Sequence, residues 1–296
     1  MDPLAILAAL GVDHAERVLP VSGGWDTSLW RVETTTERFA LRVFRPQQAK
    51  TCAREAVVMR TLREAGLPVP FVHAEGVGEG RPALLLGWCE GQTVLAAARR
   101  SPWRIWQLGV AMGRAHRRIH AVRLSEALSE ALPTWTPLGE TLHPRVLALL
   151  TDIGAGTERS ILHLDYHPLN VLTDGRTVTA VLDWANTAIG DPRADLARTV
   201  TILRLAPTPP GTPAPLVLAL RGLLEGAWRS GYRNESLSTS SDPFANLDPF
   251  YVWAGTMMQR DLRPKLGRPG VWLQESDLLR INRWTMARQA RIASFI

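Results

Sequence analysis

A polar loop between short apolar runs, followed by a hairpin, constrains this chain of 296 residues more than any other feature. The apolar pair Ile161–Leu162 leads into the loop, and Val171–Thr173 resumes as a strand. Asp174–Gly175 is a typical hairpin signal, and Val178–Leu182 is the expected partner strand. The loop before the first strand and residue 183 after the second should therefore lie on the same side of the hairpin.

Three side chains with oxygen atoms leave this side of the hairpin. Asp165 and Asn170 lie in the loop, and Asp183 follows the second strand. Convergent carboxylate and amide oxygens suit a hard cation such as Mg²⁺, which also binds phosphate oxygens. A nearby carboxylate that does not bind metal can accept a hydroxyl proton. Phosphoryl transfer needs these parts, although Asp165 alone would also suit a polar hairpin with solvated acids.

The order of the residues around these three extends the pattern. It consists of His163-x-Asp165-x-His167-Pro168-x-Asn170, then Asp183-Trp184, then Gly190-Asp191-Pro192-x-x-Asp195-Leu196-Ala197. This order resembles the aminoglycoside phosphotransferase and choline kinase-like family, and its first part fits the protein-kinase catalytic loop. The resemblance implies an α+β, two-lobed, protein-kinase-like fold. The small N-terminal lobe would be β-rich, and the larger C-terminal lobe would be mostly helical.

The resemblance also implies roles for single residues. Asp165 would be the catalytic base, and Asn170 and Asp183 would hold Mg²⁺. ATP would be the phosphoryl donor and the hydroxyl of a small molecule the acceptor. His163 would brace the loop, and Asp195 would cap it or hydrogen-bond its backbone.

Local patterns predict a change of architecture near residue 88. The β-rich runs 29–33 and 39–44 predict a hairpin, 54–65 predicts a helix that ends before Gly66, and 83–86 predicts a buried strand. From Pro102 onward the patterns are mostly helical. We expect a nucleotide-binding lobe at 1–88 and a catalytic and acceptor-binding lobe at 89–296.

Two short segments of the first lobe are candidates for nucleotide contacts. Ser22, Gly23 and Gly24 precede a strand, so they suit a Gly-rich turn that covers phosphates and equally suit an ordinary hairpin turn. Trp88 and Cys89 end a stretch that resembles the family's hinge, whose backbone meets the adenine. We expect Cys89 to be a small packed side chain and not a nucleophile.

Arg42 and Glu55 are predicted to form an ion pair. Strand alternation places Arg42 on one face with Ala40, inside an otherwise apolar run. Helical spacing places Glu55 on the same face as Val58 and Leu62. A buried charge is unfavourable unless it is paired, and protein kinases pair a strand lysine with a helix glutamate at this place. We expect both residues to support nucleotide binding; a pair without nucleotide contact is the alternative.

Other polar and aromatic residues carry weaker signals. His116 and His120 are spaced four apart on a helix, but the zinc pattern H-E-x-x-H is absent, so they are interpreted as packed or solvated. Trp253 and Asp261 are weak candidates for the acceptor pocket.

Composition excludes several classes of protein. The net charge is +6, but no block of five like charges occurs, so no nucleic-acid partner is expected. No apolar run reaches the ~18 residues of a membrane helix, and the first residues lack the basic region of a signal peptide. Two cysteines do not make a disulfide scaffold, so a cytoplasmic protein is expected, with its oligomeric state open.

The sequence therefore predicts an ATP-dependent kinase of a small molecule, with a catalytically silent nucleotide-binding protein as the alternative. From residue 200 onward there are 12 basic and 7 acidic side chains. This balance disfavours a polycationic acceptor. A sugar, an amino alcohol, a nucleoside and a neutral antibiotic all remain open.

Overall fold

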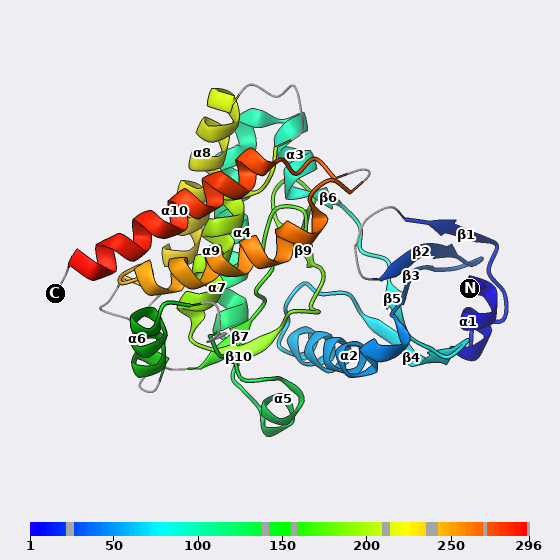
Figure 1. The fold of residues 1–296 in the computed structure, drawn as a ribbon. Helices are drawn as coiled ribbons and strands as arrows, with labels where there is room; N and C mark the ends of the chain where they lie inside the picture. The colour runs from blue at the N-terminus through cyan, green and yellow to red at the C-terminus, as the bar shows by residue number, and fades with distance from the viewer. Residues whose placement is uncertain are drawn as a thin grey trace.

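The computed structural model describes residues 1–21, 27–137, 142–154, 159–208, 214–234, 242–268 and 271–294. They form two lobes, a small one built on an antiparallel sheet and a larger one built mainly of helices (Figure 1). The predicted two-lobed α+β architecture is confirmed. Within these described ranges, no helix is both long and apolar enough to cross a bilayer.

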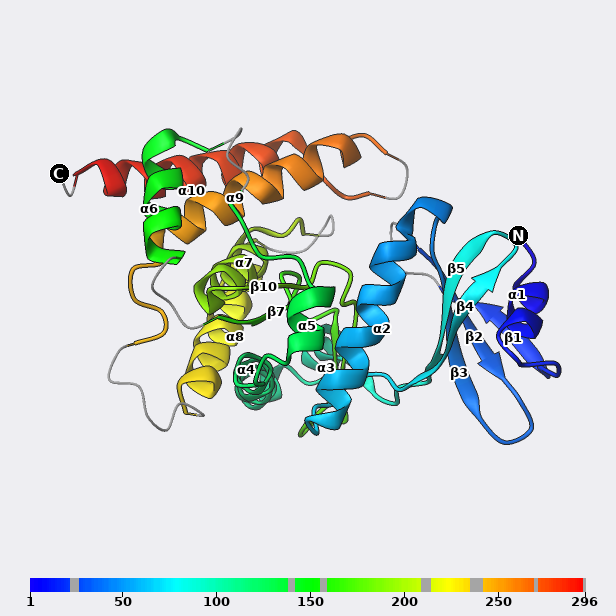
Figure 2. The same cartoon turned by 90° about the horizontal axis from the view of Figure 1, so that it is seen from below.

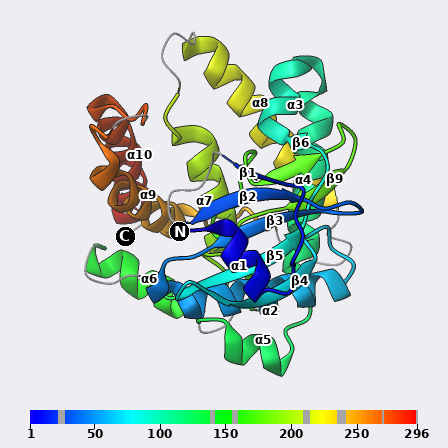
Figure 3. The ribbon, with the colours of Figure 1, turned by 90° about the vertical axis from the view of Figure 1, so that its right-hand side faces the viewer.

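The N-terminal lobe is a five-stranded antiparallel sheet in the order β1-β2-β3-β5-β4. Its strands are β1 (Arg17–Pro20), β2 (Ser28–Glu33), β3 (Arg38–Val43), β4 (Val72–Gly78) and β5 (Arg81–Gly87). Helix α2 (Ala49–Glu64) lies between the sheet and the second lobe (Figure 2), and α1 (Pro3–Ala9) crosses the outer face (Figure 3).

Strand β5 is apolar on both faces because a helix covers each face. Ala83 and Leu85 pack with Ile6 and Leu7 of α1. Leu84 alternates with them and joins the core that contains α2. The continuous apolar run at 83–86 therefore matches a strand buried on both sides.

Helix α2 begins earlier than the sequence predicted. The predicted start at Arg54 is wrong, because a 3₁₀ turn, η1 (Pro46–Gln48), leads directly into the helix at Ala49. The predicted end is confirmed: the helix stops at Glu64, and Gly66 follows with φ +75°.

The C-terminal lobe packs most of its helices around one large core, and a second, smaller core lies between its last two α-helices. Its elements are β6 (Gln92–Thr93), α3 (Val94–Arg100), η2 (Pro102–Arg104), α4 (Ile105–His120), α5 (Glu126–Ala131), α6 (Pro144–Gly154), β7 (Ser160–Leu162), β8 (Val171–Thr173), β9 (Val178–Val181), β10 (Ala188–Gly190), α7 (Pro192–Leu205), α8 (Ala214–Asn234), α9 (Asp248–Leu262), η4 (Arg263–Lys265) and α10 (Glu275–Ser294). Helices α4 and α8 can approach closely because Gly113 has no side chain. A side chain there would collide with the backbone of Trp228.

The predicted hairpin is confirmed as β8 and β9, which pair antiparallel with Val171 opposite Val181. Gly175 takes φ +96° in the turn, and the carboxylate of Asp174 accepts the backbone N–H groups of Arg176 and Thr177. This turn sends the chain back toward the loop that precedes β8, which is what brings the candidate site together.

Candidate active site

The loop between β7 and β8 is held by a buried aspartate on α7. Oδ2 of Asp195 accepts the backbone N–H of His163 at 2.6 Å, and Oδ1 accepts that of Leu164 at 2.8 Å. Leu164 has φ 61°, a conformation unfavourable for a residue other than glycine. The two charge-assisted hydrogen bonds stabilise this strained backbone one residue before Asp165. The predicted hydrogen bonds between Asp195 and the loop backbone are therefore observed.

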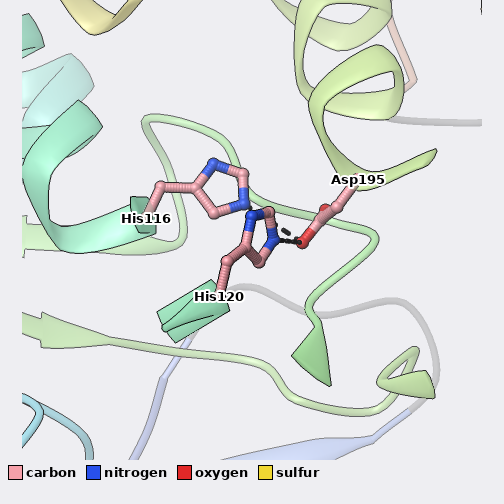
Figure 4. A group of neighbouring side chains, drawn as sticks. All are labelled: His116, His120 and Asp195. Atoms are coloured by element: carbon pink, nitrogen blue, oxygen red, sulfur yellow. Dashed lines mark hydrogen bonds and ion pairs between the residues drawn. The ribbon is translucent and has the colours of Figure 1, made fainter. Parts of the chain in front are cut away.

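Asp195 is held in turn by two histidines of α4 (Figure 4). The Nε2 atoms of His116 and His120 each lie 3.1 Å from Oδ2 of Asp195, and all three side chains are buried. His120 Nδ1 lies 2.7 Å from the hydroxyl of Tyr232 on α8. The interpretation of these histidines as packed is confirmed, and their interpretation as solvated is wrong.

Charge and burial agree with a hydrogen-bonded cluster. Burial lowers the pKa of His116 to about 4, so this imidazole is neutral and donates. Burial would raise the pKa of Asp195, but the adjacent histidines lower it well below its ordinary value. The three ligand atoms lie within 4.8 Å of one another, close enough for a metal ion. Because Asp195 already accepts two backbone donors, we interpret the group as a brace for the loop.

The carboxylate of Asp165 lies beside the side chains of Asn170 and His167. The amide nitrogen of Asn170 donates to the carbonyl of Asp165 at 3.0 Å and to its Oδ2 at 3.2 Å. His167 Nε2 lies 3.6 Å from its Oδ1. Burial would raise the pKa of Asp165, but the hydrogen bond and charge of His167, with His163 and Arg198, lower it to about 2. The carboxylate is therefore ionised at neutral pH.

His163 joins the loop to the end of β9. Its Nε2 donates to the carbonyl of Leu182 at 3.0 Å, and its Nδ1 accepts the N–H of Asp165 at 3.2 Å. The N–H of Leu182 also donates to the carbonyl of Asn170 at 2.8 Å. Asp183 follows with φ 62°. Asp165, Asn170 and Asp183 are thus brought to one place, as the hairpin pattern indicated, and His163 braces the loop.

Arg42 meets two carboxylates. Its Nη1 lies 3.1 Å from Oε2 of Glu55, which confirms the predicted ion pair. Its Nη2 donates to Oδ1 of Asp183 at 2.8 Å, a contact that the sequence did not predict. Burial would lower the pKa of Arg42, but the two carboxylates raise it. Burial raises the pKa of Glu55 to about 7, against the opposing effect of Arg42. The raised pKa keeps Arg42 protonated between the two carboxylates.

Of the other residues predicted to contact the nucleotide, the structure describes Trp88 and Cys89. Ser22, Gly23 and Gly24 lie outside the described residues. Trp88 follows β5, and its backbone N–H donates to the carbonyl of Arg38 at 3.0 Å. Cys89 is half-buried, and its Sγ lies 3.7 Å from the carbonyl of Gly87. Both residues stand where the chain leaves the sheet, as a hinge requires.

The two weak acceptor candidates differ in their surroundings. Trp253 is buried, and its ring centroid lies 5.1 Å from that of Trp135, so it is part of the core and does not line a pocket. Asp261 is 35% exposed and accepts a hydrogen bond from Arg198 at 2.8 Å.

Sequence reasoning missed two residues that touch the site. His167 was part of the motif but received no role, although it contacts Asp165. Arg198 donates from Nε to the carbonyl of Leu164 at 3.4 Å. Its position three residues after Asp195 on a helix was a usable signal, because residues three apart share a face.

The family model of the phosphotransferase enzyme family matches residues 17–232, which include both the sheet and the loop just described. The chain belongs to the phosphotransferase enzyme family.

Solved structures with a similar fold are named for different acceptors. Aminoglycoside phosphotransferase APH(4)-Ia is 16% identical, with a TM-score of 0.66 over 96% of this chain and 95% of that one. Macrolide 2'-phosphotransferase MphH from Brachybacterium faecium is 14% identical, with a TM-score of 0.59 over 94% of each chain. At these identities the structures show a shared fold. One APH(4)-Ia variant was solved with AMP-PNP and hygromycin B.

A curated relative is also similar in sequence. Homoserine kinase of Methylobacillus glycogenes is 25% identical over an alignment of 182 residues, and the match covers 55% of this chain. The match spans 56% of that protein, a little over half of its length.

Proposed function

We propose that this protein is an ATP-dependent kinase that transfers the γ-phosphoryl group to a hydroxyl of a small molecule. One observation supports the proposal most: direct hydrogen bonds link the loop around Asp165 and Asn170 to the end of β9, and Asp183 there is bound by Arg42. In this proposal residues 1–88 bind the nucleotide, and residues 89–296 supply the catalytic and acceptor-binding groups. Such a complete set of polar groups counts against a catalytically silent nucleotide-binding protein.

The donor set fits a magnesium ion. Asn170 directs its amide nitrogen toward Asp165, which turns its oxygen away from that carboxylate. Asp183 gives one oxygen to Arg42 and is 35% exposed, so the second oxygen can serve a cation. In our proposal Asn170 and Asp183 hold Mg²⁺, which would neutralise charge on the phosphate oxygens.

The protein's own residues then divide the work of the reaction. Asp165 accepts a hydrogen bond from the acceptor hydroxyl and orients it toward the γ-phosphorus. As the new O–P bond forms and the bond to ADP breaks, the hydroxyl proton passes to the Asp165 carboxylate. Arg42, held by Glu55, donates to phosphate oxygens. The backbone near Trp88 and Cys89 contacts the adenine, and Ser22, Gly23 and Gly24 cover the phosphates.

The first prediction tests Asp165. Asp165→Asn should leave Mg·ATP affinity near that of the wild type, because the residue faces the acceptor and not the nucleotide. It should lower kcat at least ~100-fold, the typical contribution of a positioned general base. An ATP-consumption screen over hydroxylated metabolites and antibiotics, homoserine included, identifies the acceptor. Calorimetry and kcat on that acceptor then give the result.

A matched change at an exposed site controls this experiment. Asp152→Asn, on the exposed surface of α6, removes the same charge and should retain activity. A kcat for Asp165→Asn within a few-fold of the wild type would refute its role as the base, as would a loss confined to nucleotide affinity.

A further inference from the structure

A row of charged side chains runs outward from the backbone beside Asp165. Arg198 of α7 donates to the carbonyl of Leu164 at 3.4 Å and to Oδ2 of Asp261 at 2.8 Å. The other carboxylate oxygen of Asp261 accepts from Nε and Nη2 of Arg260, at 3.1 and 2.9 Å. The exposed fractions of Arg198, Asp261 and Arg260 are 13%, 35% and 51%. The row therefore begins in the interior at the candidate loop and ends in solvent.

Further positive charge follows the row along the chain. The segment 260–268 contains four basic side chains and one acidic one, Asp261. In Figures 1 and 2 the C-terminal end of α9 lies on the side of the large lobe that faces the small lobe. Basic side chains at a helix C-terminus also complement the helix dipole. That effect does not account for Arg198, which lies in the middle of α7.

The charge balance has a consequence for the acceptor. A bound nucleoside triphosphate together with Asp165 and Asp183 would make the surroundings of the candidate loop strongly negative, and an anionic acceptor would be repelled without nearby cations. Two arginines around one aspartate supply a net positive charge there. Asp261 engages the Nε–Nη2 edge of Arg260, and the Nη1–Nη2 edge of a guanidinium group also matches a carboxylate with two parallel donors. A polycationic acceptor would instead meet like charge.

We propose that the row Arg198–Asp261–Arg260 is an acceptor subsite for the carboxylate of a hydroxy acid. This inference rests on the kinase function proposed above and specifies its substrate class. Arg260, the most exposed of the three, contacts the acceptor carboxylate. Asp261 and Arg198 are positioning residues that hold Arg260 at a defined place relative to the loop of Asp165.

Matched pairs of compounds test the substrate class. L-Homoserine, 4-hydroxybutyrate and D-glycerate are each compared with their carboxamides in an ADP-release assay with mass-spectrometric detection of the phosphorylated product. At least one acid should be phosphorylated with a kcat/KM about tenfold or more above that of its carboxamide, the difference that a charge-assisted, two-donor contact can supply. Equal use of acid and carboxamide overturns the proposal.

Variants test the residues with the acid that is used best. Arg260→Gln should raise KM for the acid about tenfold and leave kcat and KM for ATP within about twofold, since the contact is with the acceptor alone. Arg145→Gln is the matched control, because Arg145 is exposed on α6. Arg198→Lys, which keeps the charge, should raise KM less than Arg198→Gln does. An unchanged KM in Arg260→Gln overturns the subsite.

The two proposals fail in different ways. If the protein binds Mg·ATP and hydrolyses it slowly but phosphorylates none of the acids, the subsite is wrong and the kinase function stands. If it neither binds nor hydrolyses ATP, the kinase function is wrong and the subsite falls with it.

Discussion

Arg42 links groups that are far apart in the sequence. Strand alternation and helical spacing were sufficient to predict its contact with Glu55, because both residues belong to short regular elements of the same lobe. Its contact with Asp183 spans 141 residues and the two lobes. The periodicity of a strand or helix does not indicate how the two lobes are positioned relative to each other, so this contact could not be predicted from the sequence.

Removing the Arg42 side chain should affect both stability and nucleotide use. Glu55 is 1% exposed, so Arg42→Ala leaves a buried carboxylate without its partner. The expected loss is about 3–5 kcal/mol of the free energy of unfolding. Urea unfolding measures this loss, and calorimetry should show weaker binding of Mg·ATP.

A double variant separates these two effects. Arg42→Met with Glu55→Leu replaces both charges by apolar side chains, which should recover most of the stability but not the nucleotide affinity. Unchanged stability in Arg42→Ala would show that the ion pair contributes little. Full nucleotide affinity in the double variant would favour the alternative of a pair without nucleotide contact.

Helices α4 and α7 meet through polar atoms at the place where they support the candidate loop. The sequence indicated that Asp195 would hydrogen-bond the loop backbone, because Asp195 is part of the motif that resembles the family. It did not indicate that His116 and His120 would both reach Asp195. Helical spacing put the histidines on one face, yet only the packing of α4 against β7 and α8 decided which neighbours that face would meet.

The neutral His116 predicts acid sensitivity. Its pKa is lowered to about 4 in the folded protein, against about 6.5 in the unfolded chain. Between these values the unfolded state binds more protons, so stability is present above pH 6.5 and falls as the pH drops toward 4. By pH 5 the expected loss from this group is about 2 kcal/mol.

Urea unfolding at pH 7.5 and pH 5 measures this loss. His116→Gln removes the titrating group and should flatten the pH dependence by this amount, whatever the change in absolute stability. His14→Gln, at an exposed position, serves as the matched control and should keep the wild-type dependence. The same pH dependence in His116→Gln and the wild type would contradict the assignment.

The two lobes are joined by a short stretch of chain and by the ion pair between Arg42 and Asp183. The chain leaves β5 at Gly87 and pairs again at Gln92, where β6 joins β8. Gly91, at φ +119°, has no room for a side chain against the backbone of Thr173. A boundary near residue 88 was expected because the patterns change there from β-rich to mostly helical, whereas the tight packing of Gly91 against β8 needed the three-dimensional structure.

A nucleotide and Mg²⁺ that bind between the two lobes should stabilise the molecule as a whole. A ligand that binds the folded state alone at 100 times its Kd contributes about 2.7 kcal/mol, which corresponds to a rise in Tm of roughly 4 °C for a chain of this size. Asp183→Ala should lose the part of this rise that depends on Mg²⁺, because one of the two proposed ligands is gone. ATP without Mg²⁺ should shift Tm similarly in both proteins.

Thermal unfolding with ATP, across a Mg²⁺ titration, separates the two contributions, and Asp152→Asn should behave as the wild type. If Asp183→Ala keeps the full Mg²⁺-dependent rise, Asp183 is not a metal ligand, and its contact with Arg42 is then its main role.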